Sequence, residues 1–167
     1  GLLGQKLVDK LAGRAAVDLI ATGRGPNRNP NQEKYAYEEL DIRDEERMRD
    51  LFTVYQPTEL INCAAMTNVD QCERDPEGCH ELNVEAVDIM CRVCRDFGTK
   101  IIHVSTDFIF DGTAGPYQEK DRPNPLSIYG ESKLKGERIV VESGIPFAIA
   151  RTMLVYGVVA DMSRSNI

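Results

Sequence analysis

The sequence contains no tryptophan, only two histidines and no excess of positive charge. His80 and His103 are too few for a histidine-rich metal site, and we expect no bound metal. The net charge of -7 disfavours nucleic acid or an anionic membrane as the main partner. No apolar run approaches the roughly 18 residues of a membrane-spanning helix. With 42% hydrophobic and 28% charged residues, the 167-residue chain has the composition of one soluble globular domain.

A disulfide framework is also missing. The five cysteines are an odd number without regular spacing. Cys91 and Cys94 form a C-x-x-C, but this pair lies in a helical pattern and has no second pair to match it. We therefore expect reduced thiols rather than redox or zinc chemistry. Reduced thiols are typical of a cytosolic protein, so the predicted location is the cytoplasm.

Apolar segments alternate with segments of helical periodicity. The predicted strands cover 17–22, 35–40, 59–65, 100–104 and 145–150, and the predicted helices cover about 3–11, 44–55, 78–97 and 129–141. Loops are expected at 25–34, 69–77 and 112–125. Strands that are apolar along their length and alternate with helices predict an α/β fold, a doubly wound Rossmann-like parallel sheet with helices on both faces. We expect this domain to span 1–157, with 158–167 beginning a truncated substrate-binding part.

Two glycines stand at the start of the first predicted helix. Gly1 and Gly4 match the last two glycines of a G-x-x-G-x-x-G loop, in which the backbone approaches a pyrophosphate at a helix N-terminus. We therefore expect Gly1, Leu2, Leu3 and Gly4 to bind a dinucleotide, and a first strand and a first glycine to precede Gly1. Taken alone, G-x-x-G fits a glycine-capped turn equally well.

Arg24 follows the predicted strand 17–22. In dinucleotide-binding folds an acidic residue near this place binds the ribose 2'-hydroxyl, whereas an arginine accommodates a 2'-phosphate. Arg24 therefore predicts NADPH as the cofactor and leaves NADH as a second candidate. The alternative is a solvated loop arginine.

A hydroxyl, a phenol and an ammonium group are spaced so that they could converge. Thr106 ends the apolar run that begins at Ile101, which places it at the carboxyl end of a predicted buried strand. Tyr129 and Lys133 are four residues apart and would share one face of a helix. An isolated Y-x-x-x-K is common by chance, but here it follows a strand ending in Ser-Thr.

These segments resemble the Ser/Thr-Tyr-Lys site of the extended short-chain dehydrogenases/reductases. The S-T-D-F-I-F-D-G run at 105–112 resembles more particularly the dTDP-4-dehydrorhamnose reductase family, whose members reduce a nucleotide-linked 4-keto sugar in dTDP-rhamnose synthesis. The resemblance implies that Tyr129 donates a proton and that Lys133 lowers the pKa of this phenol and reaches the nicotinamide ribose. It also implies that Thr106 orients the substrate oxygen.

The resemblance assigns further contacts. Asp41 and Ile42 would contact the adenine, although a helix-capping aspartate is an equal alternative for Asp41. The N-C-A-A-M-T segment at 62–67 is similar to the family's N-A-A-A-x-T. The resemblance implies that Asn83 supports the active-site strand. The resemblance also implies that the cofactor contacts Cys63, Ala64, Ala65 and Thr67. A nucleotide-sugar substrate would contact Thr106, Asp107, Phe108 and Tyr129.

Two residues depart from the family pattern, and two other functions stay open. Phe108 replaces a common tyrosine and Leu154 a common tryptophan, which leaves the sugar and base preference undecided. The regulatory subunit of methionine adenosyltransferase has similar segments and is a non-catalytic partner. A nucleotide-sugar epimerase or dehydratase is the other alternative, although dehydratases carry a second acidic residue where Phe108 stands. Assembly as a homodimer is also open.

Overall fold

The structure is a computed structural model that describes residues 1–30 and 32–158. Its strands are β1 (Ile20–Gly23), β2 (Ala36–Glu39), β3 (Glu59–Asn62), β4 (Lys100–Thr106) and β5 (Phe147–Thr152). Its helices are α1 (Leu2–Leu11), α2 (Glu45–Tyr55), α3 (Val69–Arg74), α4 (Pro76–His80), α5 (Ala86–Phe97) and α6 (Ile128–Glu142). A π-helical turn η1 (Glu81–Glu85) leads into α5, and a 3-10 turn η2 (Asp107–Ile109) follows β4.

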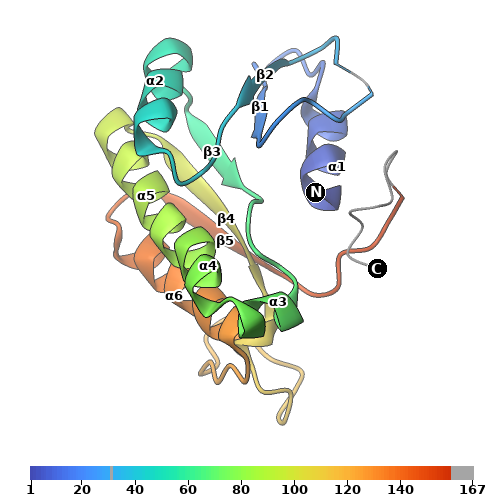
Figure 1. The fold of residues 1–167 in the computed structure, drawn as a ribbon, viewed down its shortest axis with the longest axis vertical. Coiled ribbons are helices and arrows are strands. Elements are labelled where there is room, and N and C mark those ends of the chain that lie inside the picture. Colours follow the sequence, from blue (N-terminus) through green and yellow to red (C-terminus); the bar gives the residue numbers. More distant parts are fainter. Residues whose placement is uncertain (31, 159–167) are drawn as a thin grey trace.

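The strands pair in parallel, as the sequence predicts, but in two groups. One sheet has the order β1-β2 and the other β3-β4-β5, and Figure 1 shows them as separate pairings. In a doubly wound sheet with the strand order 3-2-1-4-5-6, β1 and β2 correspond to strands 2 and 3, and β3, β4 and β5 correspond to strands 4, 5 and 6. The place between the two groups is that of strand 1 in this general order. The pairing of β3 with β4 sets Asn62 directly opposite His103, which matters for the site below.

Helices α5 and α6 pack against β4, and α2 packs against α5 (Figure 1). The main core lies between these elements and includes Phe52, Val93, Ile101 and Val140. Along β4, the side chains of Ile101, His103 and Ser105 are buried, whereas those of Ile102 and Val104 are half-buried. Within residues 1–30 and 32–158 the sheet is therefore covered more completely on the α5–α6 side than on the other, whereas the sequence predicts cover on both.

The predicted loop at 69–77 is wrong, because α3 and α4 occupy it. Asn68 caps α3 by accepting a hydrogen bond from the backbone N–H of Gln71, and Asp75 caps α4 by accepting one from Gly78. Such short polar helices depend on their caps rather than on an apolar stripe, so periodicity does not reveal them. The other predicted helices and strands are present, with ends shifted by a few residues.

All five cysteines are free. Cys91 and Cys94 lie in the main core, where burial raises the pKa of Cys91 to about 11 and that of Cys94 to about 12. Thiols with such high pKa values are inert, and the free cysteines agree with the reduced thiols that the sequence predicts. Most of the predicted second part, residues 159–167, lies outside the described residues, and the domain division at 157 stays a prediction.

Candidate active site

The three predicted catalytic residues lie at the carboxyl end of β4 and on the first turns of α6. Thr106 ends β4 and its hydroxyl accepts a hydrogen bond from the N–H of Phe108 at 3.2 Å, which starts η2. Ser127 caps α6 by accepting from the N–H of Gly130 at 3.1 Å. Thr106, Tyr129 and Lys133 are 5%, 9% and 3% exposed, so the structure buries all three side chains.

Gly130 explains how η2 and α6 approach so closely. A Cβ added at Gly130 would collide with the carbonyl oxygen of Phe108 and would come within 3.1 Å of Pro125. The absence of a side chain therefore lets the helix carry Tyr129 up to the end of β4. The ring of Phe108 meets the ring of Tyr129 edge to face, with centroids 5.8 Å apart.

The pKa of Tyr129 is raised, mainly by burial, and the hydrogen bond with Thr106 acts in the opposite direction. The expectation that Lys133 lowers this pKa is not met, because Lys133 is not among the groups that act on it. Nζ of Lys133 instead donates to the carbonyl oxygen of Val104 at 2.8 Å. Burial consequently dominates the phenol, which is held protonated and ready to act as an acid.

Lys133 itself is unusual. Burial lowers its pKa to about 8, while the carboxylate of Glu137 acts in the opposite direction. Its Nζ lies 3.4 Å from Nε2 of His103, and burial together with the charge of Lys133 lowers the pKa of that imidazole to about 3. The sequence did not single out His103 as part of the site, although its position on the active-site strand was visible.

Asn83 connects the segment after β3 with α6. Its Oδ1 accepts from the N–H of Met66 at 2.8 Å, and its Nδ2 donates to the carbonyl of Met66 at 3.0 Å and to Oγ of Ser132 at 2.9 Å. The expected support of the active-site strand is therefore wrong in its target: Asn83 holds the 62–67 segment against the helix that carries Tyr129 and Lys133.

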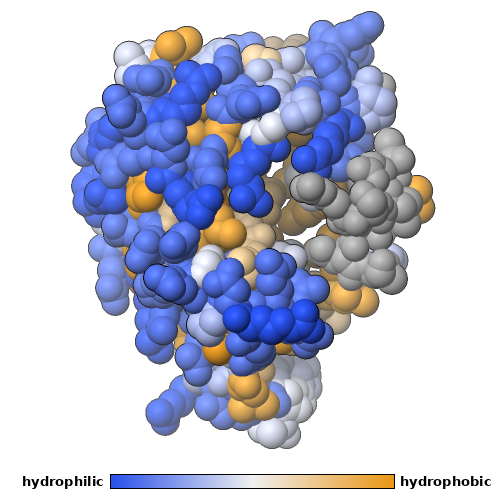
Figure 2. Space-filling model, in the orientation of Figure 1, coloured by the Kyte–Doolittle hydropathy of each residue, from blue (hydrophilic) through white to orange (hydrophobic). Residues whose placement is uncertain are grey.

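The residues predicted to bind the dinucleotide phosphates lie at the open end of α1. A Cβ added at Gly1 or Gly4 meets no atom within 4 Å, and no side chain caps the helix N-terminus. Leu2 is buried and Leu3 half-buried, so the turn is anchored while its backbone faces free space. Figure 2 shows the surface hollowed between β3 and the part that contains α1, β1 and β2. Backbone N–H groups at a helix N-terminus are of the kind that binds phosphate, and the contact of Gly1 to Gly4 with a dinucleotide stays a prediction.

Arg24 directly follows β1 and is exposed. Its guanidinium is close enough to Asp41 to contribute to the lowered pKa of that carboxyl, although hydrogen bonds from Arg43 contribute most. The position is compatible with a contact to a ribose 2'-phosphate, which stays a prediction.

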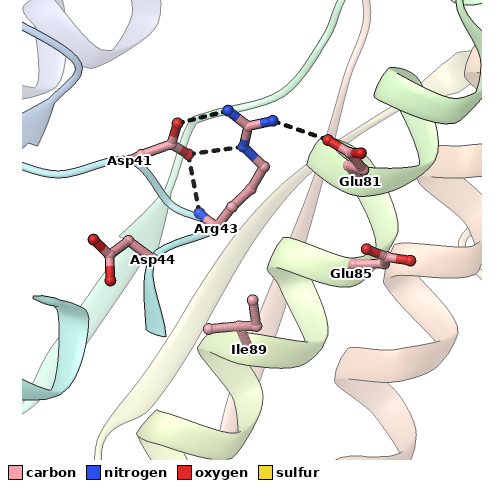
Figure 3. A pocket seen from close by; sticks show the side chains of 6 residues that line it. All are labelled: Asp41, Arg43, Asp44, Glu81, Glu85 and Ile89. Atoms are coloured by element: carbon pink, nitrogen blue, oxygen red, sulfur yellow. Dashed lines mark hydrogen bonds and ion pairs between the residues drawn. The ribbon is translucent and has the colours of Figure 1, made fainter. Parts of the chain in front are cut away.

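Asp41 lines a surface pocket of about 460 Å³ beside η1 and α5 (Figure 3). Its carboxylate accepts from the backbone N–H, Nε and Nη2 of Arg43, and Arg43 also donates to Glu81 at 2.9 Å. The alternative of a helix cap is wrong, since Asp44 caps α2. Ile42 is half-buried and packs against the main core. The adenine contact of Asp41 and Ile42 stays a prediction.

The other expected contact residues flank the same region. Cys63 and Ala65 are half-buried, and Ala64 and Thr67 are exposed. Burial raises the pKa of Cys63. On the opposite side, Asp107 and Phe108 are exposed beside Tyr129. Their contact with a nucleotide sugar stays a prediction.

Residues 1–30 and 32–158 contain no group of three or more His, Cys, Asp or Glu side chains that could hold a metal ion. In the same part of the chain, every helix is too short or too polar to cross a bilayer.

Parallel α/β architecture, with a threonine at a strand end facing a helix that carries tyrosine and lysine four residues apart, defines an extended short-chain dehydrogenase/reductase. Residues 1–165 match the family model described as the RmlD substrate binding domain, and the chain belongs to this family. The resemblance found in the sequence is thereby confirmed.

Individual relatives agree with this assignment. The crystal structure of a hypothetical dTDP-4-dehydrorhamnose reductase from Sulfolobus tokodaii is 37% identical, with a TM-score of 0.77 over 92% of this chain and 52% of the other. A dTDP-4-dehydrorhamnose reductase from Bacillus anthracis, in complex with NADP, is 30% identical, with a TM-score of 0.71 over 77% of this chain and 48% of the other. Methionine adenosyltransferase 2 subunit beta of Bos taurus is 34% identical over 78% of this chain, which spans 39% of that relative.

Proposed function

We propose that the protein is an NADPH-dependent reductase of the 4-keto group of a nucleotide-linked 6-deoxy sugar, converting dTDP-4-dehydrorhamnose to dTDP-rhamnose. The observation that carries this proposal is the hydrogen bond between Tyr129 and Thr106 at the carboxyl end of β4, with Lys133 bonded to Val104 of the same strand. The similarity to two dTDP-4-dehydrorhamnose reductases supports it. The cytoplasm is the proposed location, and a homodimer the proposed assembly.

The cofactor would lie across the end of α1 and the segment after β3. Gly1 to Gly4 would meet its phosphates, Arg24 its 2'-phosphate, and residues 63–67 its nicotinamide half. When bound, NADPH supplies the hydride, and the NADP of the Bacillus anthracis relative supports this choice.

The protein's own residues would handle the proton. Tyr129, which burial keeps protonated, would donate its phenolic proton to the oxygen of the reduced ketone. Thr106 would hydrogen-bond the same oxygen and fix its orientation. The charge of Lys133 would stabilise the phenolate that remains, since a cation nearby favours the charged form of the phenol.

A second function is favoured by a different observation. The bovine relative is a subunit of a methionine adenosyltransferase, and its similarity extends over 78% of this chain. The proposed alternative is therefore a non-catalytic subunit that binds a partner enzyme. The buried polar site would then serve nucleotide binding without turnover.

The test is oxidation of NADPH by the full-length protein with dTDP-4-dehydrorhamnose, compared with Tyr129→Phe. We expect turnover that falls at least about a hundredfold in the variant, because general acid catalysis contributes about that much or more. Tyr55→Phe is the matched control, since its hydroxyl bonds Glu38 away from the site. Absence of turnover in a protein that still binds NADPH and co-purifies with a synthetase would favour the second function.

A further inference from the structure

A chain of buried polar groups runs from the segment after β3 to Lys133. Oδ1 of Asn62 accepts from the N–H of Ala64 at 3.0 Å, and Nδ2 of Asn62 lies 3.2 Å from Nδ1 of His103. Nε2 of His103 lies 3.4 Å from Nζ of Lys133. Asn62, His103 and Lys133 are 4%, 0% and 3% exposed, so all three side chains are shielded from bulk solvent.

The direction of the first two hydrogen bonds is fixed from the Ala64 end. A backbone N–H can only donate, so the oxygen of the Asn62 amide must face Ala64. The NH2 group of Asn62 then faces His103, and Nδ1 of that ring must accept. Because burial keeps His103 neutral, its single proton is on Nε2. The Nε2–H group therefore points at Lys133.

A charged Lys133 does not complete this chain. An ammonium carries three donors and no acceptor, so it would place a donor against the Nε2–H of His103. A neutral amine has a lone pair that accepts from Nε2–H, and it keeps a hydrogen for the carbonyl of Val104. Reversing the Asn62 amide moves the conflict to Ala64 without removing it. While Lys133 is charged, this row of hydrogen bonds has a donor at each end, the N–H of Ala64 and the ammonium of Lys133. One of its hydrogen bonds can then not form.

We propose that Asn62 and His103 are positioning residues that deliver an N–H donor to Lys133 and thereby favour its neutral amine form over its ammonium form. Asn62 sets the tautomer of the ring, and His103 presents the donor. Neither residue needs to touch cofactor or substrate for this effect.

No other group that the structure describes near Lys133 supplies the acceptor that His103 fails to offer to an ammonium. Glu137, one turn further along α6, has both carboxylate oxygens engaged by Arg151, at 3.0 and 2.8 Å. Its charge acts on Lys133 in the direction that favours the ammonium. Besides Glu137 and His103, the titratable groups near Lys133 are Tyr129 one turn earlier on α6, Cys63 after β3 and Cys79 on α4.

The consequence for catalysis rests on the function proposed above. If the Lys133 ammonium stabilises the phenolate of Tyr129, activity must fall as Lys133 loses its proton to solvent. Asn62 and His103 would then set the alkaline limit of the reaction. The proposal about the charge of Lys133 can be tested whether or not the protein turns over a keto sugar.

The first test is nuclear magnetic resonance of the full-length wild-type protein without cofactor. Long-range nitrogen–proton spectra report which ring nitrogen of His103 carries the proton, and labelled lysine reports the pKa of Lys133, identified by the peak lost in Lys133→Gln. We expect the proton on Nε2 and a pKa of Lys133 well below that of the exposed lysines. A proton on Nδ1 would overturn the proposal without any variant.

Three variants test cause and effect. Asn62→Asp offers an acceptor to Nδ1–H, so the ring should change tautomer and the pKa of Lys133 should rise by about one unit or more, a tenfold change in the ratio of ammonium to amine. His103→Gln places an amide that can turn its oxygen to Lys133, and should raise the pKa similarly. His103→Asn reaches only towards Asn62 and should raise it less.

Ser105→Ala is the matched control, because Ser105 is buried on the same strand and its hydroxyl has no hydrogen-bond partner among the described residues. It should leave both the tautomer and the pKa of Lys133 unchanged. An unchanged Lys133 pKa in both Asn62→Asp and His103→Gln would refute the proposal. If the protein also reduces the keto sugar, the alkaline limb of kcat/KM should move to higher pH in these two variants. Absence of any turnover would count against the proposed function alone.

Discussion

The two parts of the molecule that would meet in the active site are built differently. In the part formed by β3, β4, β5, α5 and α6, buried polar side chains such as Asn83, His103 and Lys133 bond across elements distant in sequence. In the α1–β1–β2 part, Leu2 and Asn29 are the buried residues among those described up to 39. A Cβ added there at Gly1, Gly4 or Gly25 would meet no atom of the described residues within 4 Å.

The difference matches two kinds of task. A proton donor and its partners must be held in place before the substrate arrives, since preorganisation is what lowers the barrier. A cofactor that enters and leaves needs backbone groups that no side chain covers. The polar bonds of the first part hold its side chains in place, whereas no side chain of the described residues covers Gly1 and Gly4 in the predicted cofactor loop of the second part.

The largest expected effect comes from comparing one glycine in each part. Gly130→Ala places a Cβ against the carbonyl of Phe108, so we expect a loss of about 3 kcal/mol in unfolding free energy, at the upper end of overpacking costs. Gly4→Ala meets nothing in the protein and should not lower stability, since alanine favours helix by up to about 1 kcal/mol.

Gly4→Ala should instead raise the KM for NADPH, because the new methyl group would stand where the backbone approaches the pyrophosphate. Urea denaturation and steady-state kinetics of both variants measure the two effects. Equal losses of stability in the two variants would remove the contrast between a packed and an open part.

An intermediate effect concerns the pH dependence of stability in the packed part. The pKa of His103 is lowered from 6.5 to about 3 in the folded protein. The folded state therefore binds fewer protons than the unfolded state below pH 6.5, and stability present above that pH is lost as the pH falls towards 3. His103 alone should account for a loss of about 2 kcal/mol between pH 6.5 and pH 5.

His103→Gln should lack this contribution, and His80→Gln should retain it, because His80 is the exposed histidine. Denaturation curves of the three proteins across this pH range measure the difference. Identical slopes for wild type and His103→Gln would show that the imidazole does not titrate as its burial demands.

The smallest expected effect lies in the open part. Arg24→Gln should raise the KM for NADPH about tenfold relative to that for NADH, since a hydrogen bond to a charged group contributes about 1.5 kcal/mol or more. Stability should not change, because Arg24 is exposed. Arg14→Gln, another exposed arginine, is the control and should affect both cofactors alike. An equal change in the KM values for NADPH and NADH in Arg24→Gln would show that Arg24 does not contact the 2'-phosphate.

Sequence reasoning succeeded where the signal was local and periodic. The predicted helix 78–97 ends at the same residue as α5, Phe97, and the following Gly98 has the left-handed conformation that is typical of such a helix end. It failed at α3 and α4, whose short polar turns depend on Asn68 and Asp75 as caps. It predicted a supporting role for Asn83 but not its hydrogen-bond partners, Met66 after β3 and Ser132 on α6.

The sequence alone determined the alternation of strands and helices and the spacing of Thr106, Tyr129 and Lys133, because these follow from periodicities of the chain. It also carried the glycines and Arg24 at the predicted cofactor loop. Only the tertiary structure decided that Lys133 turns to Val104 and His103, and that burial governs the pKa of Tyr129. Charges and proton positions depend on the exclusion of solvent and on partners that strand pairing brings together. Neither can be predicted from local sequence, because both involve residues far apart along the chain.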